Sequence, residues 1–147
     1  MKLGVIVPLR SDMQKEFSKA LDLGLPTCQI ALWDYSLVSE AVAEKVKNAI
    51  NETGIEVTTL WAGWPGPTAW DLIEGPNTLG LVPTVYQYAR VEALKMASDF
   101  AKAIGVDSIT THVGFIPDNP YDPLYANLLI ALKTIVRHCR ANKQTFR

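Results

Sequence analysis

Two neighbouring segments determine the predicted fold class: Ala89-Arg-Val-Glu-Ala-Leu-Lys-Met-Ala-Ser-Asp-Phe-Ala-Lys-Ala-Ile-Gly105 and Ser108-Ile-Thr-Thr-His-Val-Gly114. The first has apolar residues three or four positions apart and a closing glycine, which predicts an amphipathic helix. The second is a short β-branched run, which predicts a strand. A helix that leads directly into a strand is typical of α/β proteins. The apolar helix positions are Val91, Leu94, Ala97, Ala101 and Ile104.

The same alternation extends over the rest of the chain. Strand-like runs occupy residues 3–9, 27–33 and 55–62, amphipathic helical patterns separate them, and a last helix spans about 123–142. Strands that alternate with helices in this way form parallel sheets. We therefore predict a single domain of four βα units over the whole chain. Residues 144–147 resemble the opening of a fifth strand.

Composition excludes several kinds of partner. The 147 residues are 48% hydrophobic and 20% charged, which suits one soluble domain with one core. Because 14 Lys and Arg residues nearly balance 15 Asp and Glu residues, we expect no nucleic-acid partner. No apolar run approaches the roughly 20 residues that cross a bilayer, so we expect a cytoplasmic protein without a membrane partner. Cys28 and Cys139 fit no zinc or disulfide pattern, and we expect two buried free thiols.

The predicted ligand site lies where the strands run into their loops, because ligands bind at the carboxyl ends of parallel strands. Trp33, Trp61 and Trp64 occur at these positions, and Trp70 lies in a long loop at residues 63–85 that we predict to be structureless. Loops of this length inside a domain are usually functional. Aromatic faces suit the C–H faces of sugars, so the first three tryptophans are candidate substrate-binding residues. The alternative is that they close the end of the core.

His112 is the candidate catalytic residue. It ends the fourth predicted strand, and Gly114 after it would let the backbone approach a ligand. This position favours a role as substrate hydrogen-bond donor, acid or base, or metal ligand. A purely structural histidine is the alternative. We expect His138, on the last helix, to be a solvated residue with no role in the site.

Common catalytic motifs are absent from the sequence. The exit of the first strand, Val7-Pro-Leu-Arg-Ser11, has no GxGxxG pattern, which disfavours a dinucleotide site. The GxxxxGK[ST], GxSxG and HExxH motifs do not occur either. The carboxylates form no compact pair, so we predict no metal-ligating residue in this chain. The sequence therefore contains no complete catalytic constellation of its own.

The helix at 89–105 and, above all, Ile109-Thr-Thr-His-Val-Gly-Phe-Ile-Pro117 resemble the sugar-phosphate isomerase/epimerase family, the xylose isomerase-like TIM barrel group. The resemblance covers essentially the whole chain and corresponds to the first half of that barrel. It implies an α/β fold consisting of a parallel (βα)4 half of a TIM barrel, without strands five to eight. It also implies that Trp33, Trp61 and Trp64 are pocket walls and that the 63–85 loop is a lid over the sugar.

Members of this family hold a divalent metal, often Mn, Mg, Co or Zn, and move a proton between adjacent sugar carbons through an enediolate. The resemblance implies that the metal ligands come from strands five to eight and are absent from this chain. His112 alone matches a family position, the histidine of the fourth strand. The apurinic-endonuclease branch is disfavoured, because it has a further ligand histidine where this sequence has Trp61.

Four βα units would leave an unclosed barrel with unpaired edge strands, since a full barrel takes about 250 residues. We expect such a surface to associate, either as a homodimer or with a remaining half supplied elsewhere. We expect the chain alone to be inactive or to depend on that association for activity. A metal-dependent sugar or sugar-phosphate isomerase or epimerase is favoured. A non-catalytic truncated half-barrel or sugar-binding module is the first alternative, and a metal-dependent hydrolase or nuclease on the same scaffold is the second.

Overall fold

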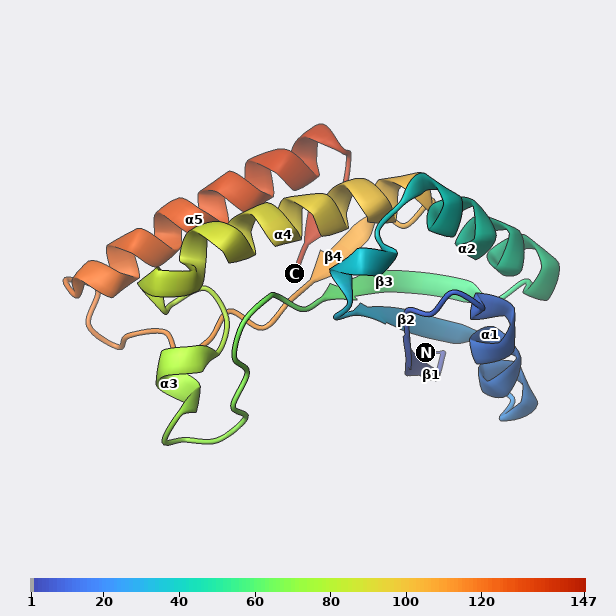
Figure 1. The fold of residues 1–147 in the computed structure, drawn as a ribbon, viewed down its shortest axis with the longest axis horizontal. Helices are drawn as coiled ribbons and strands as arrows, with labels where there is room; N and C mark the ends of the chain where they lie inside the picture. Colours follow the sequence, from blue (N-terminus) through green and yellow to red (C-terminus); the bar gives the residue numbers. More distant parts are fainter. Residues whose placement is uncertain (1) are drawn as a thin grey trace.

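The computed structural model describes residues 2–147 and contains one parallel sheet with strands in the order β1-β2-β3-β4-β5. Figure 1 shows the long helices arching over one side of the sheet, and the loop that carries α3 projecting at one end. The predicted α/β half-barrel of four βα units is confirmed. The strands are β1 (Gly4–Pro8), β2 (Thr27–Leu32), β3 (Glu56–Ala62), β4 (Ser108–Thr110) and β5 (Thr145–Phe146). The helices are α1 (Met13–Asp22), the 3-10 turn η1 (Tyr35–Leu37), α2 (Glu40–Thr53), α3 (Gly75–Thr78), α4 (Thr84–Ala103) and α5 (Pro123–Ala141).

Polar side chains cap the N-termini of the long helices α1, α2 and α5. The Asp12 carboxylate accepts a hydrogen bond from the Lys15 amide at the start of α1, and Ser39 and Asp122 cap α2 and α5 in the same way. Each such cap satisfies an amide that the first turn leaves unpaired and is worth about 1 kcal/mol. Helix α2 ends at Gly54, whose φ of +69° lies in the left-handed region that favours glycine. Local sequence thus accounts for where these helices begin and end.

The hydrophobic core lies between the helices and the sheet face that they cover. Alternate strand residues point into it, because side chains of a strand alternate between its two faces. Phe17 from α1 and Leu94 from α4 pack against them and are completely buried. Burying a side chain of this size is worth roughly 1.5–3 kcal/mol. The buried strand residues include Val7, Ile30, Leu32, Leu60 and Ile109.

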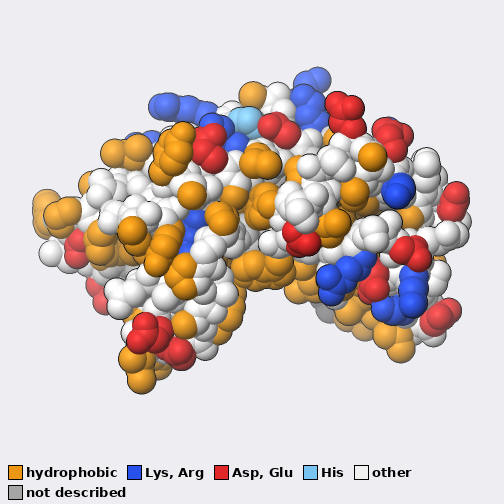
Figure 2. Space-filling model, viewed as in Figure 1, with side chains coloured by type: hydrophobic (Ala, Val, Ile, Leu, Met, Phe, Trp, Pro, Cys, Tyr) orange, Lys and Arg blue, Asp and Glu red, His pale blue; other side chains and the backbone are white. Residues whose placement is uncertain are grey.

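The other face of the sheet is open. Ile6 is 56% exposed there, although it lies in the middle of β1. In a closed barrel this face is the packed interior. Figure 2 shows apolar side chains along the hollow under the arch, between the projecting α3 loop and the end that carries α1. A groove on the open face is lined by Ile6, Gln29, Thr58, Thr59, Trp61, Thr110 and Arg147.

Strand β5 confirms the expectation that the last residues open a fifth strand. Strand five is therefore present in short form, and its absence, which the resemblance implies, is wrong. Thr145 pairs with Ser108 and Phe146 with Ile109, so β5 forms the sheet edge in place of β4. Strand β4 is shorter than predicted, because it ends at Thr110 and not at Gly114. Beyond Thr110, the Thr111 amide still donates to the Arg147 carbonyl at 3.3 Å, and the Val113 carbonyl then accepts a 2.7 Å hydrogen bond from the Leu81 amide. A run of β-branched residues predicts a strand but carries no information about such a contact with a distant segment.

The predicted structureless loop at 63–85 is more ordered than expected. It contains α3, and α4 already begins at Thr84, five residues before the periodic pattern that starts at Ala89. Within the loop, Asp71 accepts hydrogen bonds from the amides of Ile73 and Glu74. The sequence does not predict α3, because it contains a glycine and a proline, and both are poor helix formers in helix interiors.

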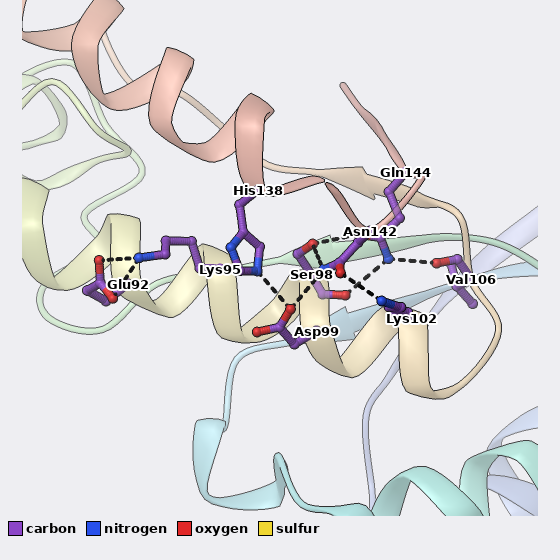
Figure 3. Close-up of polar contacts among 9 residues, drawn as sticks. All are labelled: Glu92, Lys95, Ser98, Asp99, Lys102, Val106, His138, Asn142 and Gln144. Atoms are coloured by element: carbon purple, nitrogen blue, oxygen red, sulfur yellow. Dashed lines mark hydrogen bonds and ion pairs between the residues drawn. The ribbon is translucent and has the colours of Figure 1, made fainter. Parts of the chain in front are cut away.

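A buried polar contact attaches β5 to α4. Gln144 is 7% exposed, and its Oε1 accepts a 2.5 Å hydrogen bond from the Ser98 hydroxyl (Figure 3). Its Nε2 donates to the carbonyl oxygens of Ser98 and Val106, each at 3.0 Å. Buried polar groups are stable when they are paired in this way. This side chain therefore places the residues that enter β5.

The adjoining contacts connect α5 to α4. Asn142 donates from Nδ2 to Ser98 Oγ and to Asp99 Oδ1, and His138 Nε2 lies 2.7 Å from the same carboxylate oxygen (Figure 3). Partial burial alone would raise the pKa of Asp99, but hydrogen bonds from Asn142 and His138 outweigh it and lower that pKa. The expectation that His138 is merely solvated is wrong: its side chain is 28% exposed and paired.

Two further expectations concern thiols and membranes. Cys28 and Cys139 are free and buried, as predicted. Burial raises the pKa of the Cys28 thiol to about 11 and also raises that of Cys139, so both thiols are protonated at neutral pH. Among residues 2–147, no helix combines the length and the apolar character needed to cross a membrane.

Candidate functional site

All four tryptophans and His112 gather at the carboxyl ends of β2, β3 and β4. Trp33 follows β2, Trp61 lies in β3, Trp64 follows β3, and Trp70 comes from the projecting loop. The ring centroids of neighbouring pairs lie 5.0 to 6.5 Å apart. These distances are typical of directly interacting aromatic rings. We call these five residues the aromatic cluster.

Trp64 lies at the centre of the cluster. Its ring centroid is 5.6 Å from Trp33, 6.3 Å from Trp61, 6.1 Å from Trp70 and 6.5 Å from His112. It is 3% exposed, whereas Trp33 and Trp70 are 42% and 55% exposed, Trp61 is half-buried and His112 is exposed. Trp64 therefore supports the other rings from behind, and those rings form the accessible surface. Among the described residues, its buried indole Nε1 has no hydrogen-bond acceptor.

His112 is held by its own loop. The Gly114 amide donates to His112 Nδ1 at 3.1 Å, so in the neutral imidazole the proton is on Nε2. Nε2 then is a hydrogen-bond donor of an exposed side chain. Trp70 packs edge-on against the imidazole with a centroid distance of 5.2 Å. Sequence reasoning placed Trp70 in the loop but did not pair it with His112.

The lack of a side chain at Gly63 allows the Trp33 ring to lie directly against the backbone that follows β3. A Cβ at Gly63 would stand 2.3 Å from the Trp33 ring, which is too close for any side chain. The Tyr35 hydroxyl donates to the Gly63 carbonyl at 2.9 Å and holds this backbone in place. The position of Trp33 thus depends on a close approach between two chain segments that are distant in sequence.

Arg90 is the residue that sequence reasoning missed. It is completely buried in α4, and its guanidinium lies 5.4 Å from the Trp64 ring centroid and 4.6 Å from that of Tyr86. Desolvation lowers the pKa of Arg90 to about 10, which leaves it protonated at neutral pH. The sequence does contain a signal for its burial. Arg90 precedes Ala93 and Leu94 by three and four positions, which places it on the same buried face of the helix.

Acidic side chains near the cluster are engaged in turns. Asp34 accepts hydrogen bonds from the hydroxyl and amide of Ser36, which lower the pKa of Asp34. In residues 2–147, no three His, Cys, Asp or Glu side chains come together as a group that could hold a metal ion. The divalent metal implied by the resemblance therefore does not fit the described part of the chain.

An open parallel sheet, covered by helices on one face and carrying aromatic residues at its carboxyl ends, is one half of an α/β barrel. Known structures bear this out. The chain matches a xylose isomerase domain protein from Planctomyces limnophilus with a TM-score of 0.88 and 27% identity, covering 99% of this chain and 51% of that one. No family model matches the chain, and no curated protein matches it.

Two more distant structures share the fold. A D-psicose 3-epimerase in the presence of D-fructose matches with a TM-score of 0.66, 14% identity, and coverage of 99% and 51%. A Thermus thermophilus protein soaked with zinc chloride matches with a TM-score of 0.67, 18% identity, and coverage of 99% and 55%. This chain thus has the fold of the N-terminal half of a xylose isomerase-like TIM barrel and spans about half the length of these structures.

Proposed function

We propose that this chain forms the sugar-binding wall of a xylose isomerase-like barrel that isomerises or epimerises a sugar or sugar phosphate. The aromatic cluster at the carboxyl ends of β2 to β4 carries the proposal, because it puts accessible indole faces where ligands bind in such barrels. Aromatic faces pack against the C–H faces of sugars, and a few polar groups then orient the hydroxyls. The sugar-epimerase structure among the fold matches supports the same ligand class.

Each residue of the site has a proposed role. Trp33 and Trp61 pack against the sugar and exclude water, and Trp64 completes the wall mainly by supporting their rings. His112 donates a hydrogen bond from Nε2 to a sugar oxygen, since Nδ1 is already used by the Gly114 amide. If His112 also acts in catalysis, it would exchange a proton with the sugar through this same Nε2.

Metal chemistry is not assigned to the described residues, because no ligand set comes together among residues 2–147. In the favoured function, a divalent metal would polarise the sugar oxygens when bound by ligands from other strands. This part of the barrel would bind and orient the substrate. The lack of a metal-ligand set among residues 2–147 also favours a second candidate function, a sugar-binding module without catalysis.

A ketose titration tests the binding role. D-fructose should change the tryptophan emission of the chain saturably, because every tryptophan lies in the cluster. His112→Ala should weaken the affinity about tenfold through loss of one directed hydrogen bond, and His138→Ala, remote on α5, should not. Recovery of an epimer after incubation with Mn²⁺ would distinguish catalysis from binding alone. A non-saturable response, or equal effects of the two variants, would contradict the assignment.

We also propose that two copies associate through the open face. The exposed Ile6 and the free edge of β1 support this, because exposed apolar surface and unpaired strand edges favour association. Light scattering should then give twice the chain mass at micromolar concentration, and Ile6→Lys should shift the protein toward the monomer. A stable, dilute monomer that binds no hydrophobic dye would rule this association out.

A further inference from the structure

The strongest unassigned feature is the buried positive charge of Arg90 directly behind the aromatic cluster. Among residues 2–147, no carboxylate forms an ion pair with it. Its hydrogen bonds go instead to backbone carbonyls of the loop before α4: Nε to Pro65 at 3.2 Å, Nη2 to Pro67 at 2.9 Å and Nη1 to Gly80 at 2.6 Å. A buried charge is stable only when its polar groups are compensated, so these contacts must be maintained together.

The three carbonyls come from both ends of one loop. Pro65 and Pro67 follow β3, whereas Gly80 lies just before α4, so one planar guanidinium joins the two ends. The fork geometry of arginine provides donors in several fixed directions, which the single ammonium of lysine does not. Arg90 thus acts as a clamp on residues 63–83.

The same guanidinium contacts the rings of the cluster. It lies between Tyr86 and Trp64, at 4.6 and 5.4 Å from their ring centroids. Trp64 in turn contacts every other ring of the cluster. A shift of Arg90 would therefore move the centre of the cluster and not only the loop backbone.

A second contact ties the loop to the segment that carries His112. The Leu81 amide donates to the Val113 carbonyl at 2.7 Å, and Gly80 lies against Val113 and Gly114 without room for a side chain. The loop is thus held on two sides: by Arg90 from α4 and by residues that follow β4. The loop that the resemblance implies as a lid over the sugar is therefore fastened at both of these places.

We propose that Arg90 is the positioning residue of the aromatic site, and that it makes the 63–83 loop a fixed wall in the free protein. The wall's part in recognising a sugar rests on the proposed function above. Arg90 itself does not contact the sugar in this proposal. It acts through Trp64 and through the loop backbone that presents Trp70.

Sugar-free spectroscopy tests the positioning role. In Arg90→Met, acrylamide quenching of tryptophan emission should rise at least about twofold, and the near-UV circular dichroism of the packed indoles should fall sharply. Arg90→Lys keeps the charge but loses the fork, so it should rescue these signals only in part. Tyr86→Leu keeps the carbonyl contacts and should give a smaller change, which provides a readout even where Arg90→Met folds poorly.

Ser98→Ala is the matched control. Ser98 is also a completely buried polar residue of α4, but its side chain faces Gln144 and not the cluster. It should lower the melting temperature while leaving quenching and near-UV signals unchanged. Spectra of Arg90→Met and Arg90→Lys that match the unsubstituted chain, or full rescue by lysine, would overturn the proposal. So would an equal spectral change in Ser98→Ala.

The ketose titration then separates the two proposals. If the unsubstituted chain binds D-fructose, Arg90→Lys should weaken that binding about tenfold, with His138→Ala again as the control. If the unsubstituted chain does not bind the ketose, the proposed function fails. The spectral comparison still supports or overturns the positioning role of Arg90, because it needs no sugar.

Discussion

Replacing Gly80 with alanine is expected to destabilise the chain by about 3 kcal/mol or more and to displace the segment next to His112. Gly80 has a φ of +68°, a left-handed conformation that costs an alanine roughly 1–2 kcal/mol. A Cβ there would also stand 2.1 Å from the carbonyl carbon and oxygen of Val113 and 2.3 Å from the Gly114 nitrogen. Backbone cannot rotate away as a flexible side chain can, so overpacking adds roughly 1–3 kcal/mol.

Urea unfolding measures this cost, and Gly24→Ala is the matched control. Gly24 has nearly the same φ, +72°, but a Cβ there would meet nothing within 4 Å. Its replacement should cost only the conformational part, roughly 1–2 kcal/mol. The near-UV signal of the tryptophans should change in the Gly80 variant and stay constant in the Gly24 variant. Equal losses of stability in both would show that conformation alone, and not the close approach to Val113, makes Gly80 necessary.

Gln144→Leu should destabilise the fold by roughly 3 kcal/mol, although the two side chains are similar in size. The substitution removes the acceptor of the Ser98 hydroxyl and the donor to the carbonyls of Ser98 and Val106. Each buried polar group that loses its partner costs about 1–3 kcal/mol. Because Gln144 directly precedes β5, the variant should also loosen the pairing of β5 with β4. Hydrogen exchange of the Thr145 and Arg147 amides, which donate to the Asp107 and Ile109 carbonyls, can follow this change.

A double-mutant cycle identifies the cause. Ser98→Ala combined with Gln144→Leu should cost less than the sum of the single losses, because residues in one hydrogen-bond network couple. Lys102→Met is the surface control: it removes an exposed 3.2 Å contact with Asn142 from the same region and should change stability by less than about 0.5 kcal/mol. Strict additivity of the two buried substitutions would contradict the proposed network.

Most of the fold could be predicted because its signals are local. The apolar stripe of α4, the cap residue Asp12 and the stop at Gly54 each depend on neighbours within a few positions. Parallel topology then places the carboxyl ends of all strands at one edge of the sheet, so the sequence alone predicts that Trp33 and His112 share this edge. That these residues bind a sugar stays a prediction.

The remaining features depend on contacts between distant segments. The Val113 carbonyl, three residues beyond β4, accepts a hydrogen bond from the Leu81 amide, and Trp70 packs against His112 because the intervening loop folds back. His138 finds Asp99 only when α5 lies beside α4. No period or motif encodes such pairings, since each requires two segments to arrive at the same place.

Periodicity, caps and strand order are local properties of the sequence, and they were sufficient to predict a parallel α/β fold of four βα units with three tryptophans and a histidine at its carboxyl edge. The family resemblance added the half-barrel. Tertiary structure alone put Trp64 at the centre of the cluster and Arg90 behind it. The physical reason is that a local pattern reports which face of an element is buried. What that face meets depends on the path of loops, and a buried arginine among backbone carbonyls becomes visible only when that path is known.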